Sequence, residues 1–268
     1  MTTSFRVIES TAPRLPILIS VPHCGTDFPD EIRHEYKESL IRSPDDTDWF
    51  VDQLYDFCPA LGITMITAIH SRWVIDLNRD PQSKPLYTDG RIITGLCPTT
   101  DFLGNELYVD DRSEVNQGEI DRRLQLYYWP YHHRIKTELE KLKEEFGSVL
   151  LWDCHSIRQR VPTIQEGKFP DLILGSADET SASKELINAA LHSLGGDRYQ
   201  LYHNHPFKGG YITRTYGRPD QDIHALQLEM TKLNYMDDSE KNYDPSRAKR
   251  IRELLKRTLC LLAESISS

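Results

Sequence analysis

The chain is constrained most by four short apolar runs rich in β-branched residues, each of which ends at a group of polar or small residues. The runs cover residues 15–21, 63–69, 148–152 and 171–175. Runs of about four to eight apolar residues suit buried strands, whereas a buried helix needs about ten or more. Stretches with helical spacing lie between the runs. The order of elements therefore indicates an α/β fold with a sheet between two layers of helices.

The rest of the sequence predicts the helices and the other strands of this fold. Helical stretches are expected at about 49–61, 119–146, 181–194 and 245–264. Further strands are expected at 73–75, 199–203 and 223–230. Pro130 should kink the second helix, and the irregular region of about 81–116 should form a long functional loop. Because no repeat or linker divides the 268 residues, we expect a single domain over residues 1–268.

The charge balance argues against nucleic acid and membranes as partners. Lys and Arg number 32 against 41 Asp and Glu, which gives a net charge of −9. A small anionic ligand must therefore meet a local group of basic residues. No apolar run reaches the roughly 18 residues of a membrane span, and the N-terminal residues lack the order of a signal peptide. We expect a cytoplasmic protein.

The cysteines predict reduced thiols. There are five, widely spaced and without a C-x-x-C pair, so neither a disulfide framework nor a thiolate zinc site is indicated. Cys24 and Cys154 each adjoin a histidine, which is the pattern of a cysteine nucleophile. Neighbouring side chains at a strand end point apart, however, so this chemistry ranks below a metal site.

Two histidines follow predicted strands at the edge of the sheet. His23 comes after the first apolar run and His155 after the third, and small residues flank both. Ligands of open α/β sheets bind beyond the carboxyl ends of the strands. Catalytic zinc takes three protein ligands, His or carboxylate, and keeps a fourth position for water. We therefore predict a metal site, with Asp46 or Asp48 as the third ligand.

Each of these residues also has a structural interpretation. A histidine after a strand is often only a hydrogen-bonded residue, and acids at a helix start are favoured by capping and by the helix dipole. Two other histidine pairs are alternative ligands, but His203 and His205 lie in a predicted loop, and His132 and His133 lie on a predicted exposed helix.

Seven short motifs are more specific in combination. They are Val21-Pro-His-Cys-Gly25, Asp46-Thr-Asp-Trp49, Ser71-Arg-Trp-Val-Ile-Asp-Leu-Asn-Arg79, Thr94-Gly-Leu-Cys-Pro98, Asp153-Cys-His-Ser156, Lys208-Gly-Gly-Tyr211 and Leu226-Gln-Leu-Glu229. Their order and context resemble the N-formylglutamate amidohydrolase family over about residues 15–235. The resemblance implies a phosphorylase/hydrolase-like, zinc carboxypeptidase-like fold with a mixed twisted sheet in a three-layer α/β/α arrangement.

The resemblance also implies a ligand set. It makes His23 and His155 ligands of one Zn²⁺ per chain, or of another divalent transition metal, with an acid of the early helix as the third ligand. We choose Asp46 and keep Asp48 as the alternative. The carboxypeptidase pattern of a histidine followed three residues later by a glutamate is absent, because Thr26 occupies that position.

The implied substrate is a small anion. Asn78 and Arg79 resemble the Asn-Arg pair with which carboxypeptidase-like enzymes hold a substrate carboxylate. Glutamate carries two carboxylates, so a second cation is required. The candidates are Arg72, Arg158, Arg160 and Arg214. We prefer Arg214, because it follows the glycine-rich loop.

Glu229 is the only acid in the alternating run 223–230. An acid on an apolar strand is costly without a partner or a task, and the resemblance implies that it is the general base. The predicted reaction is zinc-dependent hydrolysis of N-formyl-L-glutamate to formate and L-glutamate. Alternatives are hydrolysis of another N-acyl amino acid or of a peptidoglycan-type amide, and a non-catalytic metal-binding protein.

Overall fold

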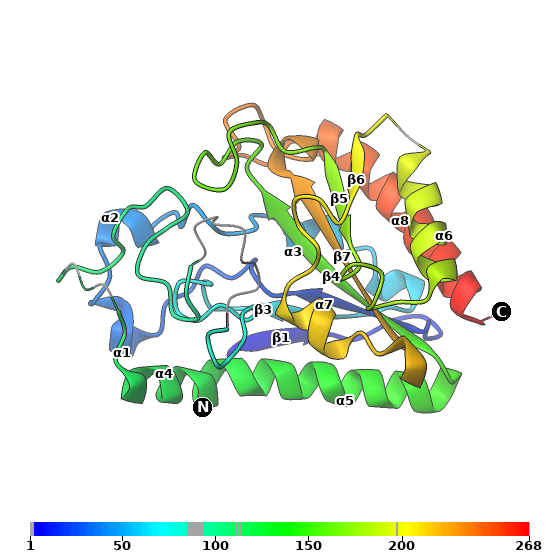
Figure 1. Cartoon of the computed structure of the whole chain (residues 1–268), viewed down its shortest axis with the longest axis horizontal. Coiled ribbons are helices and arrows are strands. Elements are labelled where there is room, and N and C mark those ends of the chain that lie inside the picture. The colour runs from blue at the N-terminus through cyan, green and yellow to red at the C-terminus, as the bar shows by residue number, and fades with distance from the viewer. Residues whose placement is uncertain (1–2, 85–93, 111, 113, 197, 268) are drawn as a thin grey trace.

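Within the described part of the chain, a mixed sheet of seven strands forms the centre of the protein (Figure 1). The computed structural model describes residues 3–84, 94–110, 112, 114–196 and 198–267. Part of the predicted loop at 81–116 therefore lies outside the described residues. In spatial order the strands are β1 (Phe5–Ile8), β3 (Thr64–Ala68), β2 (Ile17–Val21), β4 (Val149–Ile157), β7 (Ile223–Thr231), β5 (Leu172–Gly175) and β6 (Leu201–His203).

The central strands of the sheet are parallel. β2 pairs in parallel with β3 on one side and with β4 on the other, and β4 pairs in parallel with β7. Strand β1 is antiparallel to β3, and β5 is antiparallel to β7. The carboxyl ends of β2, β4 and β7 therefore meet at one edge of the sheet. Residues at these three ends become neighbours although the sequence separates them widely.

Helices cover both faces of the sheet (Figure 1). On one face, α3 (Val51–Leu54), α6 (Lys184–Gly195) and α8 (Pro245–Ser267) share a core with the strands. On the other face, α5 (Trp129–Phe146) supplies the second core. The shorter helices are α1 (Asp30–Arg33), α2 (Glu38–Ile41), α4 (Gln117–Arg123) and α7 (Tyr211–Tyr216). This arrangement confirms the predicted α/β class.

Strand β2 shows why the apolar runs are continuous rather than alternating. Ile17, Ile19 and Val21 enter the core beside α6 and α8, whereas Leu18 enters the core beside α5. All five residues of β2 are buried. A parallel strand that is covered on both faces is apolar at nearly every position; the exception in β2 is Ser20, whose hydroxyl donates to Asp153.

Most strand predictions are confirmed, and one is wrong. The runs at 15–21, 63–69, 148–152, 171–175, 199–203 and 223–230 correspond to β2, β3, β4, β5, β6 and β7. Residues 73–75 form a turn instead of a strand. Trp73 and Val74 pack into the core beside α5, so their apolar character reflects burial and not strand pairing. Strand β1, which is only half-buried, was not predicted.

The predicted helix at 49–61 forms only in part. It consists of the single turn α3, further turns, and a 3-10 helix at Pro59–Leu61. Phe50, directly before α3, has a positive φ of 62°, which a regular helix cannot contain. The acids that precede α3 therefore lie in an irregular turn and not in a helical first turn.

The predicted helix at 119–146 is confirmed, with an irregularity near Pro130. Helical backbone runs through α4, a π-helical segment at Leu124–Tyr128, and α5. Pro130 is the second residue of α5. Because proline has no backbone N–H to donate, irregular hydrogen bonding is expected where it joins the helix.

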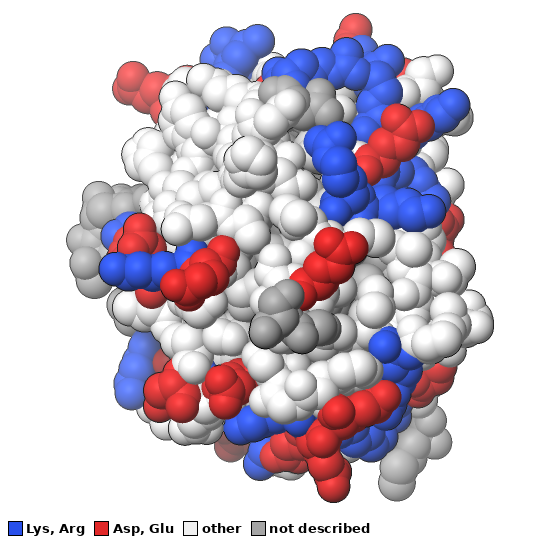
Figure 2. Space-filling view, turned by 90° about the vertical axis from the view of Figure 1, so that its right-hand side faces the viewer, with Lys and Arg blue, Asp and Glu red and all other residues white. Residues whose placement is uncertain are grey.

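Lys and Arg side chains gather in one region of the side that carries α6 and α8, which Figure 2 views. The exposed basic residues of α8 are Lys249, Arg250, Lys256 and Arg257. None of the described helices is long and apolar enough to cross a membrane.

Gly25, two residues beyond His23, permits a close backbone approach that positions this edge of the sheet. A Cβ atom at Gly25 would lie 2.3 Å from the backbone oxygen of His70, so a side chain cannot fit unless the backbone moves. We expect Gly25→Ala to lower the free energy of unfolding by about 2 kcal/mol or more. Urea denaturation measures this change. The control Gly167→Ala, where a Cβ atom meets nothing within 4 Å, should have almost no effect; equal stability of both variants would contradict the expectation.

Candidate metal centre and active site

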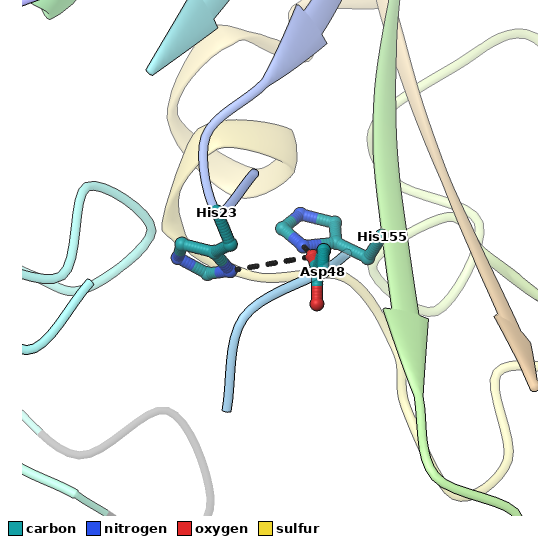
Figure 3. A group of neighbouring side chains, drawn as sticks. All are labelled: His23, Asp48 and His155. Carbon is teal, nitrogen blue, oxygen red and sulfur yellow. Dashed lines mark hydrogen bonds and ion pairs between the residues drawn. The ribbon is translucent and has the colours of Figure 1, made fainter. Parts of the chain in front are cut away.

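His23, Asp48 and His155 converge in a buried cluster (Figure 3). Their potential ligand atoms all lie within 4.8 Å of one another. Oδ2 of Asp48 is 3.1 Å from Nδ1 of His155 and 3.8 Å from Nδ1 of His23. The three residues expose 3% or less of their surface. Among the described residues, this is the group of histidines and acids whose geometry fits a metal ion.

The parallel strands bring these residues together. His23 follows the end of β2, and His155 lies within the last residues of the neighbouring strand β4. The sequence placed His155 just beyond a strand, but β4 continues through it to Ile157. Asp48 comes from the turn before α3, and its backbone N–H donates to the carbonyl of His23 at 2.9 Å. The turn is thereby held against the end of β2.

A buried carboxylate fixes the orientation of His23. Nε2 of His23 donates to Oδ1 of Asp76 at 2.7 Å, and Arg72 donates to Oδ2 of the same carboxylate at 2.6 Å. Burial opposes ionisation of Asp76, but the charge of Arg72, together with the hydrogen bond from His23, outweighs it and holds the pKa of Asp76 well below the usual range. Burial, reinforced by Arg72, lowers the pKa of His23 to about 4. His23 is therefore neutral, with Nδ1 as the acceptor nitrogen.

A second buried carboxylate orients His155 in the same way. Nε2 of His155 donates to Oδ2 of Asp153 at 2.9 Å, and Ser20 donates to Oδ1 of Asp153 at 2.9 Å. Burial opposes charging of His155, but Asp153 and Asp48 raise its pKa well above the usual range. Both histidines thus turn Nδ1 toward Asp48. Carboxylates behind metal-bound histidines fix the tautomer and the ring orientation in this manner.

The cluster fits a transition metal. Nδ1 of His23 is buried and has no hydrogen-bond partner among the described residues, so it lacks an acceptor or donor role within the protein. A metal ion would satisfy this nitrogen together with Nδ1 of His155 and a carboxylate oxygen of Asp48. Two imidazole nitrogens and one carboxylate oxygen are a donor set that zinc accepts in open, catalytic sites.

Asp46, chosen from the sequence as the third ligand, does not join this cluster. One of its oxygens accepts from Nε1 of Trp73 at 2.8 Å, and both lie 3.1 Å from the backbone nitrogen of Phe102. Burial raises its pKa to about 6. Asp46 therefore links its turn to two other loops, and Asp48, the alternative, occupies the ligand position. Sequence alone could not separate two acids that are two residues apart in an irregular turn.

Glu229 lies beside the cluster on β7. The register of the sheet pairs Glu229 with His155. Its carboxyl receives no hydrogen bond from the described residues, and burial raises its pKa to about 8. A carboxyl group that is buried beside a metal site, without a protein donor, is suited to exchange a proton near neutral pH. The base role suggested from the sequence for Glu229 remains a prediction.

Asn78 takes part in the internal network. Nδ2 of Asn78 is 3.3 Å from Oδ2 of Asp153 and 3.5 Å from Oε1 of Gln227, while Oδ1 accepts from the backbone of Ile212 at 2.8 Å. A Cβ atom at Gly210 would lie 2.3 Å from Nδ2 of Asn78, which explains the glycine there. Asn78 therefore positions Asp153 and the loop that contains Gly210. Its side-chain amide makes hydrogen bonds within the protein.

The candidate cations lie in different surroundings. Arg79 is partly buried and donates to the backbone and the hydroxyl of Thr94 at 3.1 and 3.2 Å. Arg214 is exposed and donates to the carbonyl of Gly209. Arg72 is buried, donates to Asp76, and lies 4.8 Å above the ring of Phe102. Of these, Arg72 contributes to the electrostatics of His23, Asp48 and Glu229 alike.

The alternatives to this centre are less well placed. Burial raises the pKa of the Cys24 and Cys154 thiols well above the usual range, which disfavours a thiolate nucleophile. Nε2 of His132 donates to the carbonyl of Leu77 at 2.9 Å, and Nδ1 lies 3.0 Å from the hydroxyl of Tyr216. His203 contacts Ser176. Asp76 was missed by sequence reasoning as the partner of His23, although it follows an apolar segment within one of the seven motifs.

Comparisons with known proteins agree on one family. The model of the N-formylglutamate amidohydrolase family matches residues 15–236. The N-formylglutamate deformylases of Pseudomonas putida and Pseudomonas aeruginosa are both 41% identical, over 239 and 234 residues that cover 88% and 87% of the chain and 87% and 86% of the relatives. The crystal structure of N-formylglutamate amidohydrolase from Ralstonia eutropha JMP134 has a TM-score of 0.80, with 26% identity over 97% of each chain.

The cluster predicts which acid holds the metal. Asp48→Ala should lose most of the bound metal after dialysis against buffer, because one of three ligands is removed. Asp46→Ala should retain about one equivalent, since its oxygens bond to Trp73 and Phe102. Elemental analysis of both variants decides the matter. Full metal content in Asp48→Ala together with loss in Asp46→Ala would contradict the assignment.

The raised pKa of Glu229 predicts a pH dependence of stability in metal-free protein. Between the ordinary pKa of 4.5 and the folded value of about 8, the folded state holds more protons than the unfolded state. The contribution of Glu229 is therefore complete below the lower value and is lost as pH rises through the upper value. Relative to Glu229→Gln, the unmutated protein should lose up to about 1.4 kcal/mol per pH unit in this window. Urea unfolding with chelator tests this; parallel pH profiles would contradict it.

Proposed function

The chain belongs to the N-formylglutamate amidohydrolase family, and from this premise we propose that it is a zinc-dependent hydrolase that converts N-formyl-L-glutamate to formate and L-glutamate. One observation carries the proposal: a buried His-Asp-His cluster lies directly beside Glu229, a buried carboxyl group with a raised pKa. The sequence similarity of the chain to two N-formylglutamate deformylases supports the choice of substrate. We also propose that the fold has the three-layer, zinc carboxypeptidase-like architecture.

His23, Asp48 and His155 would hold the metal, with Asp76 and Asp153 fixing the two imidazoles. When bound, zinc supplies Lewis-acid activation of a water molecule and of the formyl carbonyl. The protein side of this site is preorganised, because each histidine already presents Nδ1 and each Nε2 has a carboxylate partner. Metal binding would therefore need little movement of the rings, but it would displace the proton that His155 holds.

Glu229 is the proposed general base. Its carboxylate accepts a proton from the attacking water and then donates that proton to the amide nitrogen as the C–N bond breaks. Burial keeps its pKa near the pH at which both steps run. A carboxyl group without other donors is free to turn toward water and then toward the leaving nitrogen.

Arg72 is the proposed stabiliser of negative charge on the formyl oxygen. It is fixed by Asp76 and by the ring of Phe102, and it acts electrostatically on both Asp48 and Glu229. A preorganised cation in a site shielded from water stabilises developing charge strongly. We assign the α-carboxylate of the substrate to Arg79, whose planar guanidinium suits paired hydrogen bonds to a carboxylate.

The base assignment predicts that Glu229→Gln keeps its metal but loses turnover by about a hundredfold to ten-thousandfold, because an amide cannot accept the proton. Formate release from N-formyl-L-glutamate is the assay, and metal content is measured on the same sample. The control Glu253→Gln changes the same functional group on exposed α8 and should retain full activity. Near-normal turnover by metal-loaded Glu229→Gln would remove the base from this residue.

A further inference from the structure

Lys232 differs from the other buried cations in having no anionic partner among the residues that the structure describes. Among the described residues, the Lys and Arg side chains classed as buried are Arg72, Arg123 and Lys232. Arg72 pairs with Asp76 and Arg123 pairs with Glu119. No described carboxylate lies within ion-pairing distance of Lys232, although only 2% of its surface is exposed. A buried charge without a partner is costly, so this lysine calls for an explanation beyond stability.

The contacts of Lys232 leave part of its hydrogen-bonding capacity unused. The residue begins the 3-10 helix Lys232–Asn234, which follows β7. Its ammonium donates to the backbone carbonyl of Asp45 at 3.1 Å. An ammonium group has three N–H donors. Among the described residues, the carbonyl of Asp45 is an acceptor for one of them. Burial lowers the pKa of Lys232, while the charges of Asp48 and Asp45 favour the charged form.

Lys232 lines a small cavity between the turn of Asp45 and Asp46 and the end of β4. The cavity has a volume of about 10 Å³, which is room for one water molecule or one oxygen atom of a ligand. Its wall includes Ser156, the neighbour of His155, and Arg158. Phe102 and Val161 make part of it apolar. The cavity therefore combines a charged donor with apolar side chains in a space that admits a single polar atom.

The other charged groups around the cavity already have partners. Arg158 is paired with the carboxylates of Asp45 and Glu240. Both oxygens of Asp46 lie within hydrogen-bond distance of donors from Trp73 and Phe102. The charges of these residues are therefore largely satisfied inside the protein. Lys232 is left as the group that an incoming anion would meet.

The position of Lys232 relates it to the reaction. It is three residues beyond Glu229, and the charge of Asp48 is the largest that favours its protonated form. Lys232 thus lies on the element that directly follows the strand of Glu229, within electrostatic influence of the proposed ligand Asp48. Arg214, the cation preferred from sequence, is exposed on α7 and donates to the carbonyl of Gly209.

We propose that Lys232 binds the side-chain carboxylate of the substrate, so that it and not Arg214 makes the enzyme selective for dicarboxylic N-formyl amino acids. This inference rests on the proposed function. One carboxylate oxygen enters the cavity and accepts from the ammonium, which a compact point charge does better than a planar guanidinium in so small a space. The lysine thereby gains in the complex the anion that it lacks in the free protein.

The test compares kcat/KM for N-formyl-L-glutamate and N-formyl-L-glutamine in the unmutated enzyme and in Lys232→Met. Methionine keeps the length of the side chain and removes the charge. We expect the preference for glutamate to fall by about a hundredfold, mainly through a higher KM, with activity on glutamine nearly unchanged. Arg214→Met should keep the preference. Lys256→Met, the same change on exposed α8, should match the unmutated enzyme.

Two measurements guard against a trivial result. Because the variant removes a buried unpaired charge, its thermal midpoint should equal or exceed that of the unmutated enzyme. If Lys232→Met does not fold, Lys232→Gln, which can still donate to the Asp45 carbonyl, should show the same loss of preference.

Retention of the preference in a folded Lys232 variant would overturn the inference, as would its loss in Arg214→Met alone. Equal kcat/KM for the two substrates in the unmutated enzyme would also overturn it. A different outcome would reject the proposed function itself: absence of metal-dependent formate release from either substrate by the unmutated protein.

Discussion

The active site depends on the two hydrogen bonds that join His23 to Asp76 and His155 to Asp153. Each bond occupies Nε2 of the imidazole and so leaves Nδ1 as the nitrogen that faces Asp48. Without these carboxylates, either ring could rotate or change tautomer, and the three ligand atoms would no longer converge. The surrounding network serves this arrangement: Arg72 neutralises Asp76, while Ser20 and Asn78 hold Asp153 with neutral donors.

The sheet provides the frame on which this arrangement is built. Because β2, β4 and β7 are parallel and adjacent, His23, His155 and Glu229 arrive at one edge from positions more than two hundred residues apart in the extreme case. Cores on both faces of the sheet hold these strands rigidly. The irregular turn that carries Asp48 then closes the site. Two ligands thus come from strand ends, and the third comes from a turn that hydrogen bonds to His23, Trp73 and Phe102 hold in place.

Much of this could be predicted from the sequence where the signal is local. The apolar runs identified the central strands, and the polar residues at their ends identified His23 and His155 as candidate ligands. Glu229 was singled out as the only acid in the alternating run 223–230, and its role was implied by the family resemblance. The third ligand could not be decided, because Asp46 and Asp48 share a turn, and only the partners of Asp46, Trp73 and Phe102, distinguish them. Residues 73–75 were misjudged because burial of Trp73 beside α5 produces the same apolar pattern as a strand.

Other features of the site left no signal in the sequence. That no described carboxylate pairs with Lys232 is a property of three-dimensional packing, and nothing in the sequence around Lys232 indicates that its charge is buried. The engagement of Asn78 with Asp153, Gln227 and Ile212 likewise joins segments distant in the chain.

The central claim is that His23, Asp48 and His155 hold a catalytic metal through the two Nδ1 atoms and a carboxylate oxygen. Anomalous diffraction from crystals of the zinc-loaded protein, recorded on both sides of the zinc absorption edge, tests it most directly. The account predicts one strong peak about 2.0–2.2 Å from Nδ1 of His23, Nδ1 of His155 and an oxygen of Asp48. A peak bound through Nε2 of either histidine, or one coordinated by Asp46 in place of Asp48, would contradict it.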